Sequence, residues 1–417
     1  MNRIILVGNG FDLAHGLSTS YKNFMEWYWE QWFDKLYKCH KNTISDNLCT
    51  LTNRGGIWSA FILNKFINPL QRPNKRHVIT EILKNNEGQF GIELCPFLER
   101  IYTAIETRNW VDIENEYYQC LLEWKNYPIA QLNKDFAFLR DKLIEYLSTI
   151  ECPDVNPEIK KLIQAPILKD DIAITSLHLW KDFVNERLKY DTQKWNILLQ
   201  RYGMKLFTSR YDFDYAYLVG LPTEQEEYSF EEIERMSERL NSSKSALIPD
   251  RIMLLNFNYT NMADKSLPND EEFPIVHIHG ELTDPDGVIF GYGDEVDEGY
   301  EMLKKKNNNE YLEYMKTPRY LEADNYRRMQ AFIDSAPYQV FIMGHSCGNS
   351  DRTLLQTLFE HKNCVSIKPF YYVDEKGKTD YLDKVQNISR NFTDAKKMRE
   401  RVVNKRYCEP LPQLKAE

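Results

Sequence analysis

The feature that most constrains this chain is a short apolar run that ends directly in a glycine turn near the N-terminus. Residues 4–7 read Ile-Ile-Leu-Val, and Gly8, Asn9 and Gly10 follow at once. A run of this length and composition predicts a buried strand. Glycines after a strand let the backbone approach a pyrophosphate without Cβ clashes, and the N–H groups of the turn then face the anion. The pattern predicts a phosphate-binding turn at Gly8, Asn9, Gly10 and Asp12. A purely structural turn between a strand and a helix can have the same sequence, which is the alternative. The third glycine of the common dinucleotide-binding fingerprint is absent.

Short apolar runs of strand type return after residue 250, where they alternate with segments of helical period. The middle of the chain reads instead as amphipathic helices. Strands that alternate with helices imply a mostly parallel sheet covered on both faces. The sequence therefore predicts an α/β fold whose core combines residues 1–24 and 250–417, with a large, mainly helical insertion at 25–249. We expect strands at 251–257, 274–278, 288–291, 339–343 and 370–373, helices at 21–37, 110–124, 132–147, 228–240, 324–334 and 349–360, and a polar loop or lid at 294–320.

Composition argues against several classes of function. The net charge of −9, from 62 acidic and 53 basic residues, disfavours nucleic-acid binding by the bulk surface. No apolar run approaches the roughly 20 residues that span a bilayer, and the first run is too short for a secretory signal. The eight cysteines form no CxxC pair, so no zinc ribbon is indicated and the thiols are expected to be reduced. We expect a cytoplasmic protein with no membrane partner.

Asparagines crowd the end of the strand predicted at 251–257. Asn256, Asn258 and Asn261 stand there, although asparagine is a poor strand former. An amide both donates and accepts hydrogen bonds, which suits a ribose hydroxyl or a positioned water. These residues are therefore candidates for a site, and Asx-turn capping is the alternative for each of them.

Two histidines end the next predicted strand. His277 and His279 stand two residues apart, which places them on one face of a strand, and Gly280 follows. A histidine there suits acid/base chemistry, because its ordinary pKa of about 6.5 lies near working pH. The alternative is a pair of structural histidines bonded to backbone. No carboxylate or thiolate partner for a metal is evident, so no metal is expected.

A second glycine turn follows the strand predicted at 339–343. Gly344, His345 and Ser346 stand before the helix predicted at 349–360, and small residues here allow close backbone approach to a phosphate or ribose. Residues 344–348 also match the G-x-S-x-G elbow of serine hydrolases. That alternative makes Ser346 a nucleophile and requires His361 as its triad histidine.

An acidic pair stands near the start of the helix predicted at 110–124. Asp112 and Glu114 follow Trp110 in the run Trp-Val-Asp-Ile-Glu. Acidic residues in a first helical turn usually compensate the helix dipole. They are also candidates for an acid in a pocket.

Taken together, these segments resemble the AbiH family of bacteriophage abortive-infection proteins. The resemblance implies a role in phage defence and names no reaction. The matching segments agree in order and spacing and run along most of the chain: ILVGNGFDLAHGLSTSYKNF, WVDIE, LNFNYTN, HIHGEL, IFGYGDE and FIMGHSCGNSDRTLL.

The same order of motifs is similar to that of sirtuin-type NAD-binding domains. That similarity implies a Rossmann-like core with NAD as substrate or ligand, and catalytic roles for His279 and Asn258. No cysteine stands between Gly280 and Gly344, so the four-cysteine zinc module of deacylating sirtuins is missing. The chain looks more like zinc-free defence relatives that cleave NAD to nicotinamide and ADP-ribose. The cofactor-binding residues implied are Gly8, Asn9, Gly10, Asp12, Gly280, Gly344, His345, Ser346 and Asp351.

Three functions compete on these grounds. The first is an NAD glycohydrolase acting in phage defence. The second is a non-catalytic nucleotide-binding sensor whose insertion meets partners, and the third is a serine hydrolase using Ser346. The implied partners are a small-molecule nucleotide, a phage-derived trigger or partner protein, and a second copy of the chain in a homo-oligomer.

Overall fold

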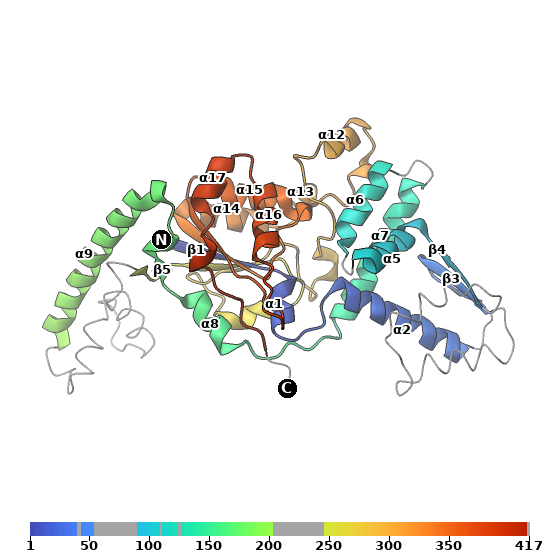
Figure 1. Ribbon diagram of the computed structural model, residues 1–417, viewed down its shortest axis with the longest axis horizontal. Helices are drawn as coiled ribbons and strands as arrows, with labels where there is room; N and C mark the ends of the chain where they lie inside the picture. Colours follow the sequence, from blue (N-terminus) through green and yellow to red (C-terminus); the bar gives the residue numbers. More distant parts are fainter. Residues whose placement is uncertain (40–42, 54–89, 109–110, 124–126, 203–245, 415–417) are drawn as a thin grey trace.

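The centre of the protein is one parallel sheet of five strands (Figure 1). The structure is a computed structural model and describes residues 1–39, 43–53, 90–108, 111–123, 127–202 and 246–414. The strands lie in the order β10-β9-β1-β7-β8, and every pairing is parallel. Counted along the chain, this order is 3-2-1-4-5, as in doubly wound nucleotide-binding folds. The predicted α/β class with a Rossmann-like, parallel sheet is confirmed. The strands are β1 (Asn2–Val7), β7 (Ile252–Asn256), β8 (Ile275–His277), β9 (Tyr338–Met343) and β10 (Cys364–Pro369).

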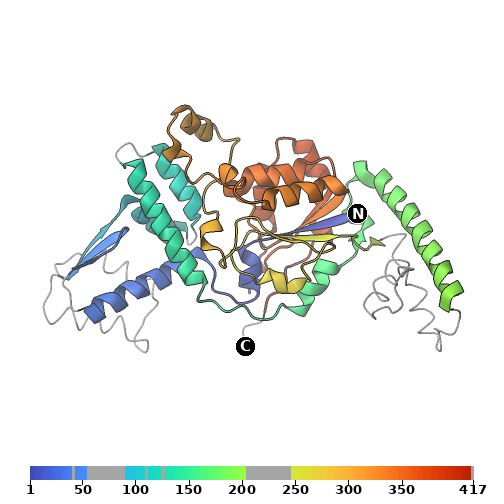
Figure 2. The ribbon, with the colours of Figure 1, turned by 180° about the vertical axis from the view of Figure 1, so that it is seen from behind.

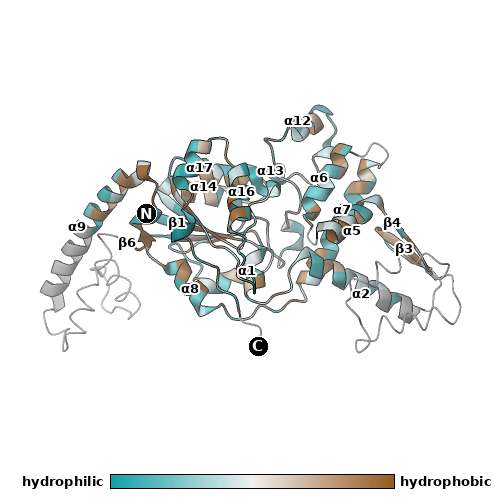
Figure 3. Cartoon of the chain, in the orientation of Figure 1, coloured by the Kyte–Doolittle hydropathy of each residue, from teal (hydrophilic) through white to brown (hydrophobic). Residues whose placement is uncertain are grey.

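Helices cover both faces of this sheet because its strands are apolar on both sides. In β1, Ile4 and Leu6 pack in the core on one face, and Ile5 and Val7 pack in the core on the other. Figures 1 and 2 show the covering helices on either side, and Figure 3 shows that these helices carry both apolar and polar residues. The first face is covered by α14 (Asn325–Ser335), α15 (Arg352–Glu360) and α16 (Tyr381–Arg390), and the second by α1 (Asn9–Ala14) and α8 (Pro157–Gln164).

Much of the region predicted as an insertion forms a separate cluster beside the sheet (Figures 1 and 2). Its core is rich in aromatic rings, with Phe136 stacked on Tyr117 and on Phe290. Residues 288–315, from the C-terminal half of the chain, complete this core. The elements are α2 (Tyr21–Cys39), β2 (Thr43–Ser45), β3 (Cys49–Asn53), β4 (Phe90–Leu94), α5 (Pro96–Arg108), α6 (Ile113–Glu123) and α7 (Ile129–Leu147).

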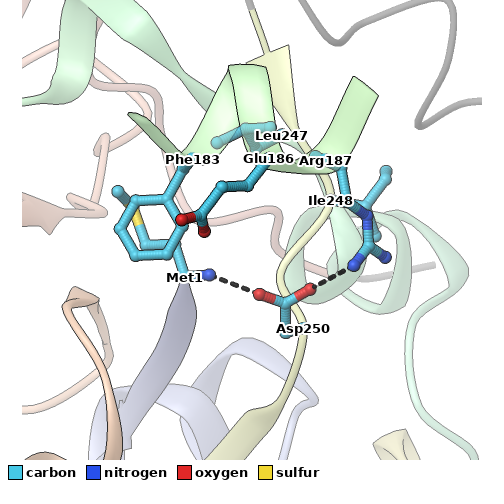
Figure 4. Close-up of a pocket in the computed structure, with 7 residues that line it drawn as sticks. All are labelled: Met1, Phe183, Glu186, Arg187, Leu247, Ile248 and Asp250. Carbon is cyan, nitrogen blue, oxygen red and sulfur yellow. Dashed lines mark hydrogen bonds and ion pairs between the residues drawn. The ribbon is translucent and has the colours of Figure 1, made fainter. Parts of the chain in front are cut away.

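Apart from α8, the remaining elements of the described insertion lie across the sheet from this cluster (Figure 1). There β5 (Ile167–Leu168) pairs with β6 (Ala246–Leu247), and α9 (Leu177–Tyr202) begins beside them. Asp250 joins this region to the start of β1. It pairs with the Met1 amino group and lies 3.1 Å from Nη1 of Arg187 (Figure 4). No helix in the described ranges is both long enough and apolar enough to cross a membrane.

Two predicted strands are wrong. Residues 288–291 form no strand: Val288 and Phe290 pack in the insertion core, whereas Ile289 packs in the sheet core. The apolar run thus belongs to a segment that lies between two cores. The last strand of the sheet is β10, which ends at Pro369, so residues 370–373 follow it and are not a strand of this sheet. The sequence did not predict β10 because the strand contains the polar residues Ser366 and Lys368. Ser366 accepts a hydrogen bond from Gln339 at 3.1 Å inside the sheet.

The segment 294–320, predicted as a polar loop or lid, folds into ordered structure. It contains α12 (Glu298–Lys305) and α13 (Lys316–Arg319), and the Lys316 side chain is fully buried. The helices predicted at 21–37, 132–147 and 324–334 are confirmed, and that at 349–360 begins with the short 3-10 turn Asn349–Asp351. The helix predicted at 228–240 lies outside the described residues.

Candidate functional site

A cavity of about 520 Å³ lies at the carboxyl ends of β1, β7 and β9. The strand order reverses between β1 and β9, and this switch point is where open α/β sheets bind ligands. The size falls in the range of small-molecule sites. The opposite wall comes from the helical cluster beside the sheet, with Tyr21 and Lys22 at the start of α2, Glu114 of α6 and Leu143 of α7.

The predicted site residues converge on this cavity, with one exception. Gly280 does not line it; its φ is +79°, and a Cβ there would collide with the carbonyl of Gly287. Gly280 is therefore a turn glycine. The predicted residues that do line the cavity are Gly8, Asn9, Gly10, Asp12, Asn258, His279, Gly344, His345, Ser346 and Asp351.

The two glycine turns interlock with each other. A Cβ on Gly10 would lie 2.8 Å from the Gly344 Cα, and a Cβ on Gly344, whose φ is +82°, would collide with the Phe11 nitrogen. The Gly10 N–H donates to the Gly344 carbonyl at 2.9 Å, and the Gly8 N–H donates to Met343. These two N–H groups bond within the protein, so the expectation that they face an anion does not hold. Turn-to-turn packing explains why glycine stands at these positions.

Asp12 organises the asparagine end of β7 from the first helix. Its carboxylate accepts hydrogen bonds from Asn258 Nδ2 at 2.9 Å and from the Thr260 hydroxyl at 2.6 Å. The Asn256 side chain accepts from the Asn258 backbone N–H at 2.9 Å, which is an Asx turn. Asn256 therefore has the capping role, while Asn258 is oriented towards the cavity with its amide oxygen available to a ligand. Burial raises the pKa of Asp12 to about 6, although Thr260 and Asn258 oppose the shift.

The raised pKa of Asp12 predicts that the stability of the fold depends measurably on pH. Its folded-state pKa of about 6 exceeds the ordinary 3.8, so its contribution to stability is lost as pH rises through this window. The isosteric Asp12→Asn can still accept from Asn258 and can donate to Thr260, and it does not titrate. We expect the free energy of unfolding of the wild type, minus that of Asp12→Asn, to fall by about 2 kcal/mol between pH 4 and pH 7. Urea unfolding across this range measures the difference, and a constant difference would contradict the role of Asp12.

The two histidines have different surroundings, because β8 ends at His277. His277 Nε2 lies 2.9 Å from Asp264, outside the cavity. His279 lies in the following turn, lines the cavity and places Nε2 3.1 Å from Asp351 Oδ1 and 3.2 Å from the Tyr320 hydroxyl. The expectation that both rings share one strand face is therefore wrong, and His279 alone is positioned to meet a ligand.

A buried ion network lies behind His279. Lys316 Nζ lies 2.7 Å from Asp351 Oδ1 and 3.2 Å from the Glu114 carboxylate. Burial alone would raise the pKa of Asp351, but Lys316 and His279 hold it well below its usual range. Burial, aided by Lys316, lowers the pKa of His279 to about 4. At neutral pH, Asp351 is ionised and His279 is a neutral ring that donates from Nε2, which leaves Nδ1 as its acceptor.

The geometry opposes the serine-hydrolase alternative. His361 pairs with Asp334 at 3.3 Å and stacks on Tyr338, at the start of β9. Ser346 follows the other end of that strand, about 20 Å away for six residues of strand. His345 does not replace His361, because its Nδ1 accepts from the Cys347 N–H at 3.0 Å and its Nε2 lies 3.4 Å from Asp351. No described residues assemble the required triad around Ser346.

Comparison with known families adds an independent finding. A family model described as bacteriophage abortive infection AbiH matches residues 4–373 of the 417 residues. The chain belongs to the AbiH family. Its role is therefore in bacteriophage abortive infection. Searches of curated proteins and of solved structures found no match.

The AbiH match includes most of the cavity residues but ends before the segment that holds the second glycine turn in place. Asn387 of α16 donates at 2.9 Å to the Ser346 carbonyl, and Asn391, directly after this helix, donates at 2.9 Å to the Cys347 carbonyl. The same helix places Lys384 on the cavity wall, 3.4 Å from Asp380. These residues lie beyond 373, so they brace the second glycine turn from outside the matched region.

Several residues in or directly behind the cavity of this AbiH protein escaped prediction. Lys316 was hidden in a polar segment, and a lysine that follows a run of lysines gives no signal of burial. Lys384 sits in an ordinary amphipathic helix. Asp112 and Glu114 were noticed as possible pocket acids, and both line the cavity; Trp110 lies outside the described residues. Among the residues that the structure describes, no group of three or more His, Cys, Asp or Glu side chains is arranged to hold a metal ion.

Proposed function

We propose that this AbiH protein binds NAD in the cavity and hydrolyses it to nicotinamide and ADP-ribose. The observation that carries the proposal is the convergence of His279, Asn258 and two glycine turns on one cavity at the switch point of the sheet. Phosphate-bearing nucleotides bind at this point in related architectures. The sirtuin-like assignment of these residues is part of the proposal.

The charges around the cavity suit a ligand with a cationic ring and an anionic pyrophosphate. Lys384 and Ser346 lie together beside the second glycine turn and offer a cation and a hydroxyl to phosphate oxygens. Asp112 and Glu114 lie on the insertion wall; burial raises the pKa of both carboxyl groups, and a cationic ring beside them would favour their ionised forms. The nicotinamide ring therefore faces the insertion wall, and the phosphates face α16.

The reaction requires stabilisation of a positively charged ribose. The nicotinamide–ribose bond breaks through an oxocarbenium-like state, which orientation and nearby negative charge favour. The neutral His279 ring accepts a hydrogen bond from a ribose hydroxyl, while Asp351 fixes the ring from behind. The amide oxygen of Asn258, held in place by Asp12, orients the attacking water.

The test is the release of nicotinamide by the full-length protein. Purified protein incubated with NAD, and cells that express it before and during phage infection, are sampled and separated by chromatography. We expect nicotinamide and ADP-ribose to accumulate in equal amounts while NAD falls. If NAD stays constant in both settings, hydrolysis is excluded.

A second candidate is a sensor that binds a nucleotide without cleaving it. It is favoured by one observation: the sheet and the separately packed insertion each form one wall of the cavity. A bound ligand would therefore fix one relative to the other. Calorimetry distinguishes this function by a saturable heat of binding with NAD or ADP-ribose and no product.

A further inference from the structure

Glu114 belongs to the insertion, yet its carboxylate lies on the cavity with the sheet residues. It is the second residue of α6 and is only 7% exposed. Its Oε1 accepts a hydrogen bond from the Gly291 N–H at 2.9 Å, and Lys316 Nζ lies 3.2 Å away. These contacts fix the carboxylate at the cavity wall, so its position is built by three separate segments of chain.

Glu114 is connected to His279 through two buried charges. Lys316 lies closer to Asp351, at 2.7 Å, than to Glu114, and Asp351 Oδ1 lies 3.1 Å from His279 Nε2. The positive charge of Lys316 is therefore matched mainly by Asp351. Glu114 keeps a proton affinity that is unusual for a carboxylate, since burial raises its pKa to about 8 against the opposing effect of Lys316.

The groups that surround Glu114 are mostly neutral or negative. Lys316 of α13 is the cation that contacts it, and carboxylates disfavour its ionised form from two sides. A cationic ligand would favour that form. The titratable or charged groups packed near Glu114 are Tyr21 of α2, Asp112 before α6, Tyr259 after β7, His279 after β8, Lys316 and Tyr320 at α13, and Asp351 before α15.

The chemistry of the proposed reaction requires a proton acceptor that His279 does not provide. A general base works best when its proton affinity matches the operating pH, and the buried His279 ring is too weak a base for this. Asp351 is committed to Lys316 and His279. Among the other carboxylates that line the cavity, Asp12 accepts from Asn258 and Thr260, and Asp112 accepts from the backbone N–H of Asn115 at the start of α6. Glu114 is fixed at the cavity wall by Gly291 and Lys316 and has the proton affinity that suits a base near neutral pH.

We propose that Glu114 is a catalytic residue of this cavity and takes the proton from the attacking water. This inference rests on the proposed NAD hydrolysis. In the step, the bond between ribose C1′ and the nicotinamide nitrogen breaks, and its electron pair leaves with nicotinamide. The water oxygen bonds to C1′, and its proton passes to the Glu114 carboxylate and then to solvent. One NAD and one water give nicotinamide, ADP-ribose and one proton.

The experiment compares Glu114→Gln with Glu116→Gln in the nicotinamide-release assay. Glu116 is a matched control, because it is a buried glutamate on the same helix that pairs with Arg100 at 2.5 Å and does not line the cavity. We expect Glu114→Gln to lower kcat about 100-fold with KM within about threefold of the wild type. Glu116→Gln keeps kcat within about threefold.

A pH profile separates catalysis from a structural effect. Because the base must be ionised, kcat/KM of the wild type rises with pH, is half-maximal near pH 8 and levels off about one pH unit higher, and this rise disappears in Glu114→Gln. Glu114→Asp keeps the titrating carboxylate one methylene farther away. It retains the pH-dependent rise at a rate about tenfold lower, and it covers the case in which Glu114→Gln fails to fold.

The outcomes are distinguishable. A Glu114→Gln protein with wild-type kcat and an unchanged pH profile, alongside an inactive His279→Ala protein, overturns the role of Glu114 and leaves the proposed function standing. If Glu114→Gln fails to fold and Glu114→Asp loses the pH-dependent rise, the role is also overturned. A wild-type protein that releases no nicotinamide, purified or in infected cells, overturns both.

Discussion

A His279→Ala protein is expected to cleave NAD about 1000-fold more slowly than the wild type, measured as kcat/KM. His279 is the histidine that lines the cavity, and its Nε2 lies 3.1 Å from Asp351. Alanine removes the proposed acceptor for the ribose hydroxyl and leaves the Asp351 carboxylate without its histidine partner. Loss of one positioned hydrogen-bonding group that stabilises a transition state costs roughly 100- to 1000-fold in rate.

The matched control for this substitution is His277→Ala. His277 stands two residues earlier and is 10% exposed, but its ring pairs with Asp264 and does not line the cavity. We expect activity within about threefold of the wild type, with some loss of stability because Asp264 loses its partner. Equal loss of activity in both variants, or a fully active His279→Ala protein, would remove His279 from the proposed site.

The second large effect is on folding: Gly344→Ala is expected to abolish the native state or destabilise it by about 4 kcal/mol or more. The left-handed conformation at φ +82° costs about 1–2 kcal/mol for a residue with a Cβ. That Cβ would also collide with the Phe11 backbone nitrogen, which no side-chain rotation relieves. Forcing extra atoms into a packed site adds about 1–3 kcal/mol or more. Urea unfolding, or the soluble yield if no folded protein is obtained, measures the effect.

Gly16→Ala separates the two contributions. Gly16 has φ +79° at the end of α1, and nothing lies within 4 Å of the position of its Cβ. Only the conformational cost remains there, so we expect a loss of about 1 kcal/mol. If Gly344→Ala is no more damaging than Gly16→Ala, the two glycine turns do not interlock as described.

The parallel sheet and the position of the cavity followed from short-range patterns. Apolar runs that end in Gly8, Asn258 or Gly344 mark the carboxyl ends of parallel strands, and such ends meet at one edge. The elements that failed prediction depend on tertiary contacts. β10 buries Lys368 because Asp171, nearly two hundred residues away, pairs with it at 3.2 Å. No local pattern contains that partner.

The roles of individual residues inside the cavity were harder to predict than their presence. The glycines were assigned to a phosphate, but the opposing turn explains their identity, since Gly8 and Gly10 abut Gly344 and His345. Glu114 was predicted as a helix-start residue with a pocket acid as the alternative, and no specific role followed from the sequence. Its importance depends on Lys316, which reaches it from a segment 202 positions away in the sequence.

The bracing of the second turn by α16 has a practical consequence for anyone who trims this protein. A fragment cut where the AbiH match stops, at residue 373, would lose Asn387, Asn391 and Lys384 together. The Ser346 and Cys347 carbonyls would lose those amide donors, and the cavity would lose a lysine from its rim. Such a fragment could therefore lose activity because its second glycine turn is no longer braced, even with every other cavity residue present. An activity assay therefore requires a protein that keeps Lys384, Asn387 and Asn391.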